Sequence, residues 1–455
     1  MKKKLALLLA MVMLFTSLVG CGSKQTETAE TKTENETETT SHAEEATETE
    51  ETVRAFEGVT LNVLGNNSVV GECILENKDD LYEKTGIILN YEQYSNEQLS
   101  SKLAVSLAAG STDIDIMLIR PLDEAALFIE NGWAENLSTW IAENPDELPI
   151  DEFFPVSLEL CSDENGEVYG IPTNGENAVV FYNKTMFAEA GITELPTTID
   201  ELYETAALLD DPENGICGFV CRGAGNAAVT QFSCYLRAFG ADFFDEEGNA
   251  AINTPEAIAA FEAYGKILRD YGPDGVLNMG QPDTWSLFTQ GKAAMRIDTN
   301  SNMGIWDPDS SAITLDEIGF FQVPVGPNGD HGDFSIVAQA AMMSATSARK
   351  DAAWAFLCWL SSAEIQIKMQ EHGASSFHTA AWEDNYSSWP VELQEVTAAS
   401  SAVAVPTDRP LMTNVGQARD IVGEVIVAAI EGETDIAELA NEKNAELQEL
   451  IDSEK

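Results

Sequence analysis

Basic residues are scarce in this chain. It holds 24 lysines and arginines against 77 aspartates and glutamates, so its formal net charge is −53. Nucleic-acid binding depends on lysine and arginine contacts with phosphates, and so acidic a chain argues strongly against a nucleic-acid partner. The charge says little about the fold.

Histidines and recognisable catalytic motifs are also lacking. The chain has four histidines, and it contains neither Gly-x-Ser-x-Gly nor His-Glu-x-x-His. Residues 223–228 match a loose dinucleotide fingerprint, but a glycine-rich loop is the better interpretation. We therefore expect no metal, no cofactor and no enzymatic activity. A pair of carboxylates acting on glycans stays open as an alternative, because acidic residues are so abundant.

Only one long hydrophobic run is present, at residues 5–15, and three lysines precede it. Leu18-Val19-Gly20-Cys21 follows, which is typical of a lipoprotein signal peptide over residues 1–20 with Cys21 as the lipidated first residue of the mature chain. No other segment approaches the roughly 20 apolar residues of a membrane helix. We expect a protein on the extracytoplasmic face of the cell membrane, anchored by lipid alone.

Aromatic residues are absent from residues 24–54, where threonine and glutamate alternate. Such a segment cannot bury enough apolar surface to offset its backbone entropy. We expect residues 21–54 to be a lipidated cysteine followed by a disordered spacer that holds the body away from the membrane.

Cysteine use leaves the redox state open. Beyond Cys21 there are six cysteines, an even number that permits disulfides outside the cell without revealing any pairing: Cys73, Cys161, Cys217, Cys221, Cys234 and Cys358. The spacing of Cys217 and Cys221 matches no common zinc or redox motif. Buried free thiols are the favoured interpretation.

From residue 59 the pattern is α/β. Apolar runs at residues 59–63, 87–91 and 115–119 predict strands, and the segments between them predict helices, one ending at Gly86 and one starting at a Ser95 capping box. This alternation is typical of doubly wound sheets.

The second half repeats the pattern. Residues 178–182 predict a strand, and helices are predicted from a Thr198 capping box and from Thr254-Pro255. Residues 351–360 predict a core helix, and residues 417–450 are helical.

Several segments occur in a fixed order over residues 58–455. They are residues 102–116, Tyr169-Gly170-Ile171-Pro172, residues 180–191, residues 285–295, residues 324–329, residues 351–357 and Arg409-Pro410. Together they resemble the extracellular solute-binding proteins of family 1, which includes maltodextrin-binding proteins. The resemblance implies a two-domain periplasmic-binding-protein-like fold of type II, with interleaved domains and hinge crossings. By that analogy, residues 55–174 plus 335–385 form one lobe, and residues 175–334 plus 386–455 form the other.

The resemblance also implies a function. Such proteins capture a mono- or oligosaccharide between the lobes by hinge closure and deliver it to the membrane permease of an ABC importer. We expect a monomer with these partners. The open alternatives are an exported glycan-acting enzyme and a sensor lipoprotein that presents the solute to a receptor kinase.

Candidate solute contacts lie just past strand ends and at the expected crossings, where α/β sheets bind ligands. They are Asn66, Asn67, Arg120, Asp123, Asn174, Glu176, Asp298, Asn300, Asn302, Gln339 and Trp285. Glu176 leads because its place seven residues before Asn183 resembles that of a sugar-binding glutamate in maltodextrin binders.

Other interpretations compete at each position. The asparagines could be turn residues, Asp298 could cap a helix and Trp285 is more often a core residue. Residues 298–302 lack the stacking tryptophan of maltodextrin binders, which puts maltodextrin in doubt. A glycerol phosphate ester or a polyamine also stays open, although a phosphate favours several arginines and only Arg120 is placed among the candidates.

Overall fold

The computed structural model describes residues 54–382, 389–432 and 435–454. The predicted signal peptide and nearly all of the predicted spacer lie outside these residues. No helix in the described part combines the length and the apolar character needed to cross a membrane.

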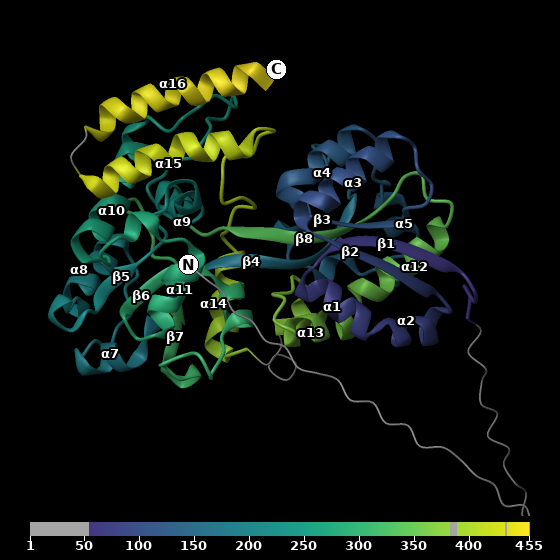
Figure 1. The fold of residues 1–455 in the computed structure, drawn as a ribbon, viewed down its shortest axis with the longest axis horizontal. Coiled ribbons are helices and arrows are strands. Elements are labelled where there is room, and N and C mark those ends of the chain that lie inside the picture. The colour runs from purple at the N-terminus through teal and green to yellow at the C-terminus, as the bar shows by residue number, and fades with distance from the viewer. Residues whose placement is uncertain (1–53, 383–388, 433–434, 455) are drawn as a thin grey trace, which may run out of the picture. The chain divides into compact units, whose positions relative to one another are not determined.

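Eight strands form one mixed sheet in the order β2-β1-β3-β8-β4-β6-β5, with β7 paired to β4 (Figure 1). The strands are β1 (Thr60–Asn66), β2 (Ile88–Tyr94), β3 (Ile116–Ile119), β4 (Gly170–Asn183), β5 (Cys217–Val220), β6 (Ala293–Thr299), β7 (Ile318–Phe321) and β8 (Ser335–Met343). β1 runs parallel to β2 and β3, and β5 runs parallel to β6. The predicted α/β class is confirmed.

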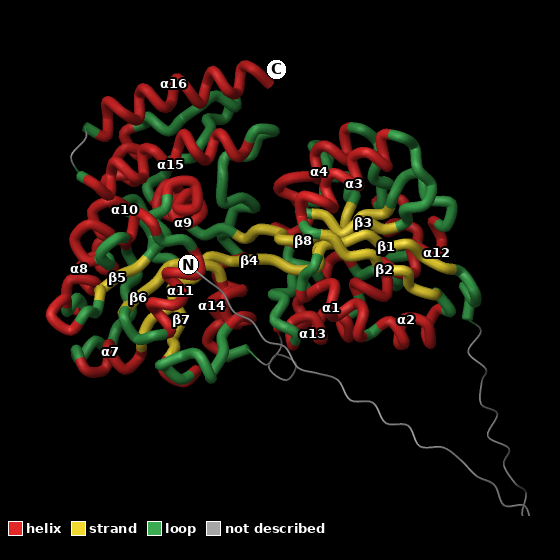
Figure 2. Tube along the Cα trace, viewed as in Figure 1, coloured by secondary structure: helices red, strands yellow, loops and turns green. Residues whose placement is uncertain are grey.

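Strands β4 and β8 join the two halves of this sheet. The first part of β4 pairs antiparallel with β8, and its second part, from Ala178 onward, pairs with β6 and β7. β8 in turn pairs with β3. In Figure 2 these two strands run from one group of helices to the other. We call the half with β1, β2 and β3 the N-lobe and the half with β5, β6 and β7 the C-lobe.

Helices cover both faces of the N-lobe sheet (Figure 1). They are α1 (Val69–Glu76), α2 (Lys78–Thr85), α3 (Asn96–Ala108), α4 (Pro121–Glu130), α5 (Ser138–Glu143), α6 (Pro155–Glu159), α12 (Lys350–Ser361) and α13 (Ala363–Glu371), with 3-10 turns η1 (Ile150–Glu152) and η6 (Thr379–Trp382). Successive residues of β3 face opposite layers: Leu118 packs in the cluster of α1 and α12, and Met117 and Ile119 pack in that of α3 and α4. Because helices cover both faces of the sheet, a strand such as β3 has apolar side chains on both sides.

The C-lobe repeats this design. Its helices are α7 (Lys184–Glu189), α8 (Ile199–Leu209), α9 (Gly225–Ala238), α10 (Pro255–Tyr271), α11 (Gln281–Thr289), α14 (Val391–Ser401), α15 (Val415–Glu431) and α16 (Ile436–Glu454), with 3-10 turns η2 (Pro212–Asn214), η3 (Val276–Asn278), η4 (Asn300–Ile305) and η5 (Leu315–Glu317). Val180 of β4 packs in the cluster of α8, α9, α10 and α15, whereas Phe181 packs in that of α11 and α14.

Short-range signals are confirmed where they were predicted. Ser95 and Thr198 form the capping boxes of α3 and α8. Gly86 ends α2 in the left-handed conformation, at φ 83°. Each of these devices is complete within a few residues, so it does not depend on the rest of the fold.

Two predicted elements differ from the structure. The stretch at residues 417–450 is two helices, α15 and α16, because Gly432 adopts φ 74° and ends α15. The strand predicted at residues 178–182 is the second half of the 14-residue β4. The first half contains Pro172, Gly175 and two register shifts, which hid it from a search for regular alternation.

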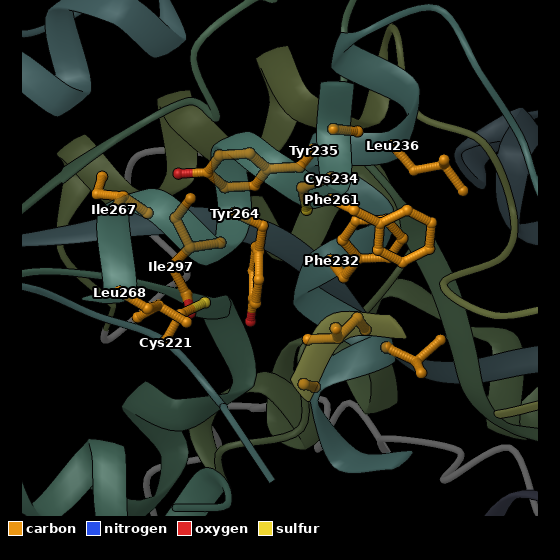
Figure 3. Close-up of a cluster of buried hydrophobic side chains, with 14 of the residues drawn as sticks. Cys221, Phe232, Cys234, Tyr235, Leu236, Phe261, Tyr264, Ile267, Leu268 and Ile297 are labelled. Carbon is orange, nitrogen blue, oxygen red and sulfur yellow. The ribbon is translucent and has the colours of Figure 1, made fainter. Parts of the chain in front are cut away.

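The six described cysteines are free, as favoured from the sequence, and five of them are buried. Cys221 and Cys234 lie in the C-lobe core shown in Figure 3, and burial raises the pKa of both thiols. In the same core, Phe232 stacks on Phe261 with ring centroids 4.2 Å apart. The Tyr264 hydroxyl donates a hydrogen bond to the backbone oxygen of Arg222 at 2.6 Å, which ties this core to the loop after β5.

Candidate functional site

Two predicted residues meet where β1 ends. The Asn66 side chain donates to Asn96 Oδ1 at 2.8 Å and accepts a hydrogen bond from Gln339 Nε2 of β8. Asn174 of β4 pairs in register with Gln339. Asn67 is exposed beside this amide group, and its backbone N–H donates to the Tyr94 oxygen at 3.1 Å. The structure therefore brings Asn66, Asn174 and Gln339 together at the junction of the lobes.

Arg120 and Asp123 lie at the start of α4, directly after β3. Arg120 Nη1 is 2.9 Å from Asp123 Oδ2, and both side chains are partly exposed. Leu122, which lies between them in the chain, packs against the main apolar cluster of the C-lobe although it belongs to the N-lobe. The first turn of α4 is therefore a point at which the two lobes touch.

Glu176 lies on β4 at the crossing between the lobes, opposite Ile336 of β8. Its side chain is partly exposed, and Oε1 accepts a hydrogen bond from Ser301 Oγ at 3.3 Å. Burial raises the pKa of Glu176, and nearby Arg222 and Arg409 act in the opposite direction. The other oxygen, Oε2, accepts no hydrogen bond from the residues that the structure describes.

Asp298 is fully buried within β6, not after the strand as predicted. Its oxygens accept from Arg222 Nη2 and Nε at 2.7 and 3.2 Å, from Gln231 Nε2 at 3.0 Å and from the Thr299 N–H at 2.9 Å. Arg296 Nη2 is a further donor. Burial alone would raise the pKa of Asp298, but the two guanidinium groups outweigh burial and lower it.

Asn300 and Asn302 of η4 are buried and use their amides within the protein. Asn300 Oδ1 accepts from the Asn177 N–H at 3.0 Å, and its Nδ2 donates to hydroxyls of Ser375 and Thr397, each at 3.1 Å. Asn302 Nδ2 donates to the Thr299 oxygen at 2.7 Å. These contacts shape the loop that carries Ser301 to Glu176.

Trp285 of α11 lies in an aromatic cluster of the C-lobe. It is 8% exposed and packs edge-on against Phe181 at 5.6 Å between ring centroids. The buried guanidinium of Arg296 lies 5.3 Å from its ring centroid. Arg296 and the neighbouring aromatic rings cover most of the Trp285 ring, so little of it is exposed.

Three arginines that were not among the candidates lie at this junction. Arg222 after β5 and Arg409 after Asp408 act on the charge of Glu176. Arg419 of α15 donates to Thr230 Oγ1 at 3.2 Å, and Thr230 in turn donates to Asp408. Arg222 could have been found because it follows a strand end. Arg409 belongs to Arg409-Pro410, one of the segments that carry the family resemblance, but no pattern in the sequence showed that it lies where the two lobes meet.

These arginines are matched by carboxylates from both lobes. Burial disfavours the charge of Arg409, but Asp408, Asp123 and Glu176 outweigh burial and raise its pKa. Burial, together with Arg409, lowers the pKa of Arg419 to about 10. We call the full set the interlobe cluster: Arg222, Arg296, Arg409 and Arg419 with Asp123, Glu176, Asp298 and Asp408. Arg120, which pairs with Asp123, borders this set.

Two surface hollows of the described residues are lined by none of the predicted residues. One of about 450 Å³ is lined by Phe56, Val59 and residues 347–352 of the N-lobe. Within the described residues, no group of three or more histidine, cysteine, aspartate or glutamate side chains is placed to hold a metal ion.

Two α/β lobes joined by shared strands, with a charged cluster at their junction, define a solute-binding architecture. Residues 72–367 match the family of bacterial extracellular solute-binding proteins, and the chain belongs to this family.

Its relatives in that family include polyol binders. The mannitol-binding protein of Pseudomonas aeruginosa is 28% identical over 312 residues, which cover 67% of this chain and 69% of the relative. The erythritol/L-threitol-binding protein of Mycolicibacterium smegmatis is 25% identical over 340 residues, covering 70% of each. The ABC transporter solute-binding protein of Agrobacterium radiobacter K84, solved with ribitol, has a TM-score of 0.72 and 25% identity over 87% of this chain and 99% of its own.

Proposed function

We propose that this protein captures a neutral carbohydrate, a sugar or a sugar alcohol, between its two lobes and delivers it to the permease of an ABC importer. Glu176, Asn66, Asn174 and Gln339 contact the solute. β4 and β8 act as hinge strands, and closure is favoured by the solute only through its greater affinity for the closed form. The relatives described above include proteins that bind mannitol, erythritol or ribitol, all of which are neutral polyols.

The observation that carries this proposal is that arginines of the interlobe cluster already pair with buried carboxylates, Arg222 and Arg296 with Asp298 and Arg409 with Asp408. A phosphate ester would bring two negative charges to a group whose arginines are already matched by carboxylates. A polyamine would bring cations to carboxylates that already have guanidinium partners. A neutral polyhydroxylated solute adds no charge and satisfies both kinds of polar partner, since hydroxyls donate to carboxylates and accept from guanidinium groups.

The anchor is also part of the proposal. Cys21 carries the lipid, and residues 21–54 form the spacer between membrane and body. Replacing Cys21 by serine should release the chain from the membrane fraction into the medium, as immunoblotting of both fractions would show. A variant that stays in the membrane fraction would contradict the lipid anchor and leave the solute assignment untouched.

A thermal-shift screen of the full-length chain tests the solute class. The panel is mannitol, ribitol, erythritol and maltose, with glycerol 3-phosphate and spermidine as charged controls. A solute that binds only the native state raises the melting temperature with the logarithm of its concentration over Kd. We expect a shift with at least one neutral solute and none with the controls.

Glu176→Gln is the matched variant, because it keeps the shape of the side chain and removes its charge. We expect the shift to be lost or strongly reduced. A shift with glycerol 3-phosphate or spermidine alone would keep the fold and overturn the carbohydrate assignment.

A further inference from the structure

Arg222 is held on one edge and free on another. Its Nε and Nη2 atoms form a fork on the fully buried carboxylate of Asp298, at 3.2 and 2.7 Å. Its Nη1 atom makes no hydrogen bond within the described residues, and the side chain is 15% exposed. A fork of this kind fixes the guanidinium plane, so the free Nη1 points in a defined direction.

Arg409 repeats this arrangement from a distant part of the chain. Its Nε and Nη2 atoms lie 2.5 and 2.9 Å from the oxygens of Asp408, which is also fully buried. Thr230 Oγ1 of α9 donates to the same carboxylate at 2.7 Å and holds it in place. Arg409 Nη1 again has no hydrogen-bond partner in the part of the chain that the structure describes, and the side chain is 19% exposed.

Glu176 lies within the electrostatic range of both guanidinium groups. Arg222 and Arg409 both act on the carboxylate of Glu176, and it acts on both of them. No ion pair joins Glu176 to either arginine among the described residues, so the three groups interact electrostatically without direct contact. The turn after β6 links two of these groups, because Asp298 holds Arg222 at 2.7 Å and Ser301, which follows it closely in the chain, donates to Glu176 at 3.3 Å.

We propose that Arg222 and Arg409 are specificity-determining residues, each presenting one fixed Nη1 donor near the Glu176 acceptor, and that together they select a solute with adjacent hydroxyls. Asp298 and Asp408 are positioning residues that hold the two guanidinium planes. This inference rests on the proposed function and names the groups that read the solute.

The chemistry of adjacent hydroxyls suits such a set. Each hydroxyl both donates and accepts, so one hydroxyl can donate to Glu176 while its neighbour accepts from an arginine. A solute that lacks one of these hydroxyls leaves a desolvated donor or acceptor unpaired, which discriminates far more strongly than the loss of an apolar contact. The two clamped arginines thus give selectivity without adding net charge.

The test replaces each clamped arginine by lysine in the full-length chain, as Arg222→Lys and Arg409→Lys. Lysine keeps the charge, but its single ammonium cannot both pair with the buried aspartate and reach the solute as a fork does. We expect Kd for mannitol or ribitol, measured by isothermal titration calorimetry, to rise about tenfold or more in each variant, since a charge-assisted hydrogen bond is lost.

Arg349→Lys is the matched control. Arg349 also pairs through Nε with a fully buried aspartate, Asp115, at 2.9 Å, but it lies in the N-lobe outside the interlobe cluster. We expect its Kd to equal that of the wild type. Melting temperatures of all three variants without solute show whether a weaker Kd comes from a damaged fold.

The outcomes separate the two proposals. If the wild type binds mannitol or ribitol and both lysine variants bind equally well, the role of the arginines is wrong and the carbohydrate assignment stands. If the wild type binds no neutral polyol or sugar, the proposed function fails and this inference fails with it. A loss of affinity that also appears in Arg349→Lys would overturn the inference, because it would trace the effect to stability.

Discussion

Two arginine–aspartate pairs in this molecule have the same chemistry and different surroundings. Arg349 pairs with Asp115 in the N-lobe, and Arg222 pairs with Asp298 in the C-lobe; both aspartates are fully buried. Arg349 is 32% exposed and Arg222 is 15% exposed. The more exposed arginine is the one to which we assign no part in binding.

The difference lies in which end of a strand each pair occupies. Asp115 directly precedes β3, and it also accepts hydrogen bonds from the Asn62 N–H of β1 at 2.8 Å and from Ser347 Oγ at 2.5 Å. It therefore ties β1 and the segment before α12 to the start of a strand. Arg222 follows β5, at the carboxyl end, where α/β sheets bind ligands.

This comparison teaches that an ion pair cannot be assigned a role from its residue types or its burial. Asp115 has neighbours that belong to one lobe. Arg222 has Asp298 on one side and the field of Glu176, at the crossing between lobes, on the other. The first pair holds elements together, and the second holds a donor in position.

The largest expected effect is on stability, and it should be shared by both pairs. Asp298→Asn and Asp115→Asn each leave an arginine without its buried counter-charge, which costs about 3–5 kcal/mol when one partner of a buried pair is removed. Urea unfolding monitored by circular dichroism would measure this free energy. Asp298→Asn should cost more, because Arg296 is also fully buried beside it. Equal stability of variant and wild type would show that these pairs are replaceable packing groups.

Asp333 is a buried aspartate with no arginine in an ion pair among the described residues, and it should make the stability of the protein depend on pH. Asp333 precedes β8 and is 1% exposed, and burial raises its pKa to about 7, with hydrogen bonds from Ser400 and Gln322 offsetting this only in part. The native state thus binds more protons than the unfolded chain between about pH 4 and pH 7. The free energy of unfolding contributed by Asp333 should fall as pH rises through that window.

Melting temperatures from pH 5 to pH 8 check this expectation. Asp333→Asn should flatten the pH dependence seen in the wild type. Two titratable groups lie near Asp333: Cys234, and His331 with Nδ1 at 3.6 Å. His331→Gln serves as the control and should keep most of the slope. An Asp333→Asn chain with the slope of the wild type would show that the carboxylate stays ionised when buried.

The smallest expected effects come from two serines that serve the compared regions. Ser347 Oγ donates to Asp115 at 2.5 Å, and Ser301 Oγ donates to Glu176 at 3.3 Å. Ser347→Ala should lower the free energy of unfolding by about 1 kcal/mol and leave Kd unchanged. Ser301→Ala should weaken binding a few-fold and leave stability unchanged. If each serine affected the other property instead, the division between a structural and a binding region would be wrong.

Features formed by residues close together in the chain could be predicted from the sequence. The capping boxes at Ser95 and Thr198 and the helix stop at Gly86 involve neighbours in the chain, so the pattern alone is sufficient. The buried strand at 115–119 was visible as an apolar run, and it appears as β3. Asn66 was a candidate because it was expected just past the first strand, and the structure places it as the last residue of β1.

The partners of the site residues were not within reach. Arg222 and Asp298 are 76 positions apart, and no local pattern links them. Asp298 was a candidate because it is polar and near a strand end, yet its carboxylate has protein donors on both oxygens. Arg409 and Glu176 are also far apart in the sequence, and only the tertiary fold brings Arg409 near Glu176. The irregular first half of β4 was hidden because its bulges break the alternation.

The most direct test of the central claim is the affinity of the wild-type chain and of Glu176→Gln for mannitol, ribitol, erythritol and maltose, measured side by side by isothermal titration calorimetry. The account predicts saturable 1:1 binding of at least one neutral solute, and about 2 kcal/mol of lost binding free energy, roughly thirtyfold in Kd, when the acceptor is neutralised. Binding with unchanged Kd in Glu176→Gln, or no binding of any neutral solute by the wild type, would contradict it.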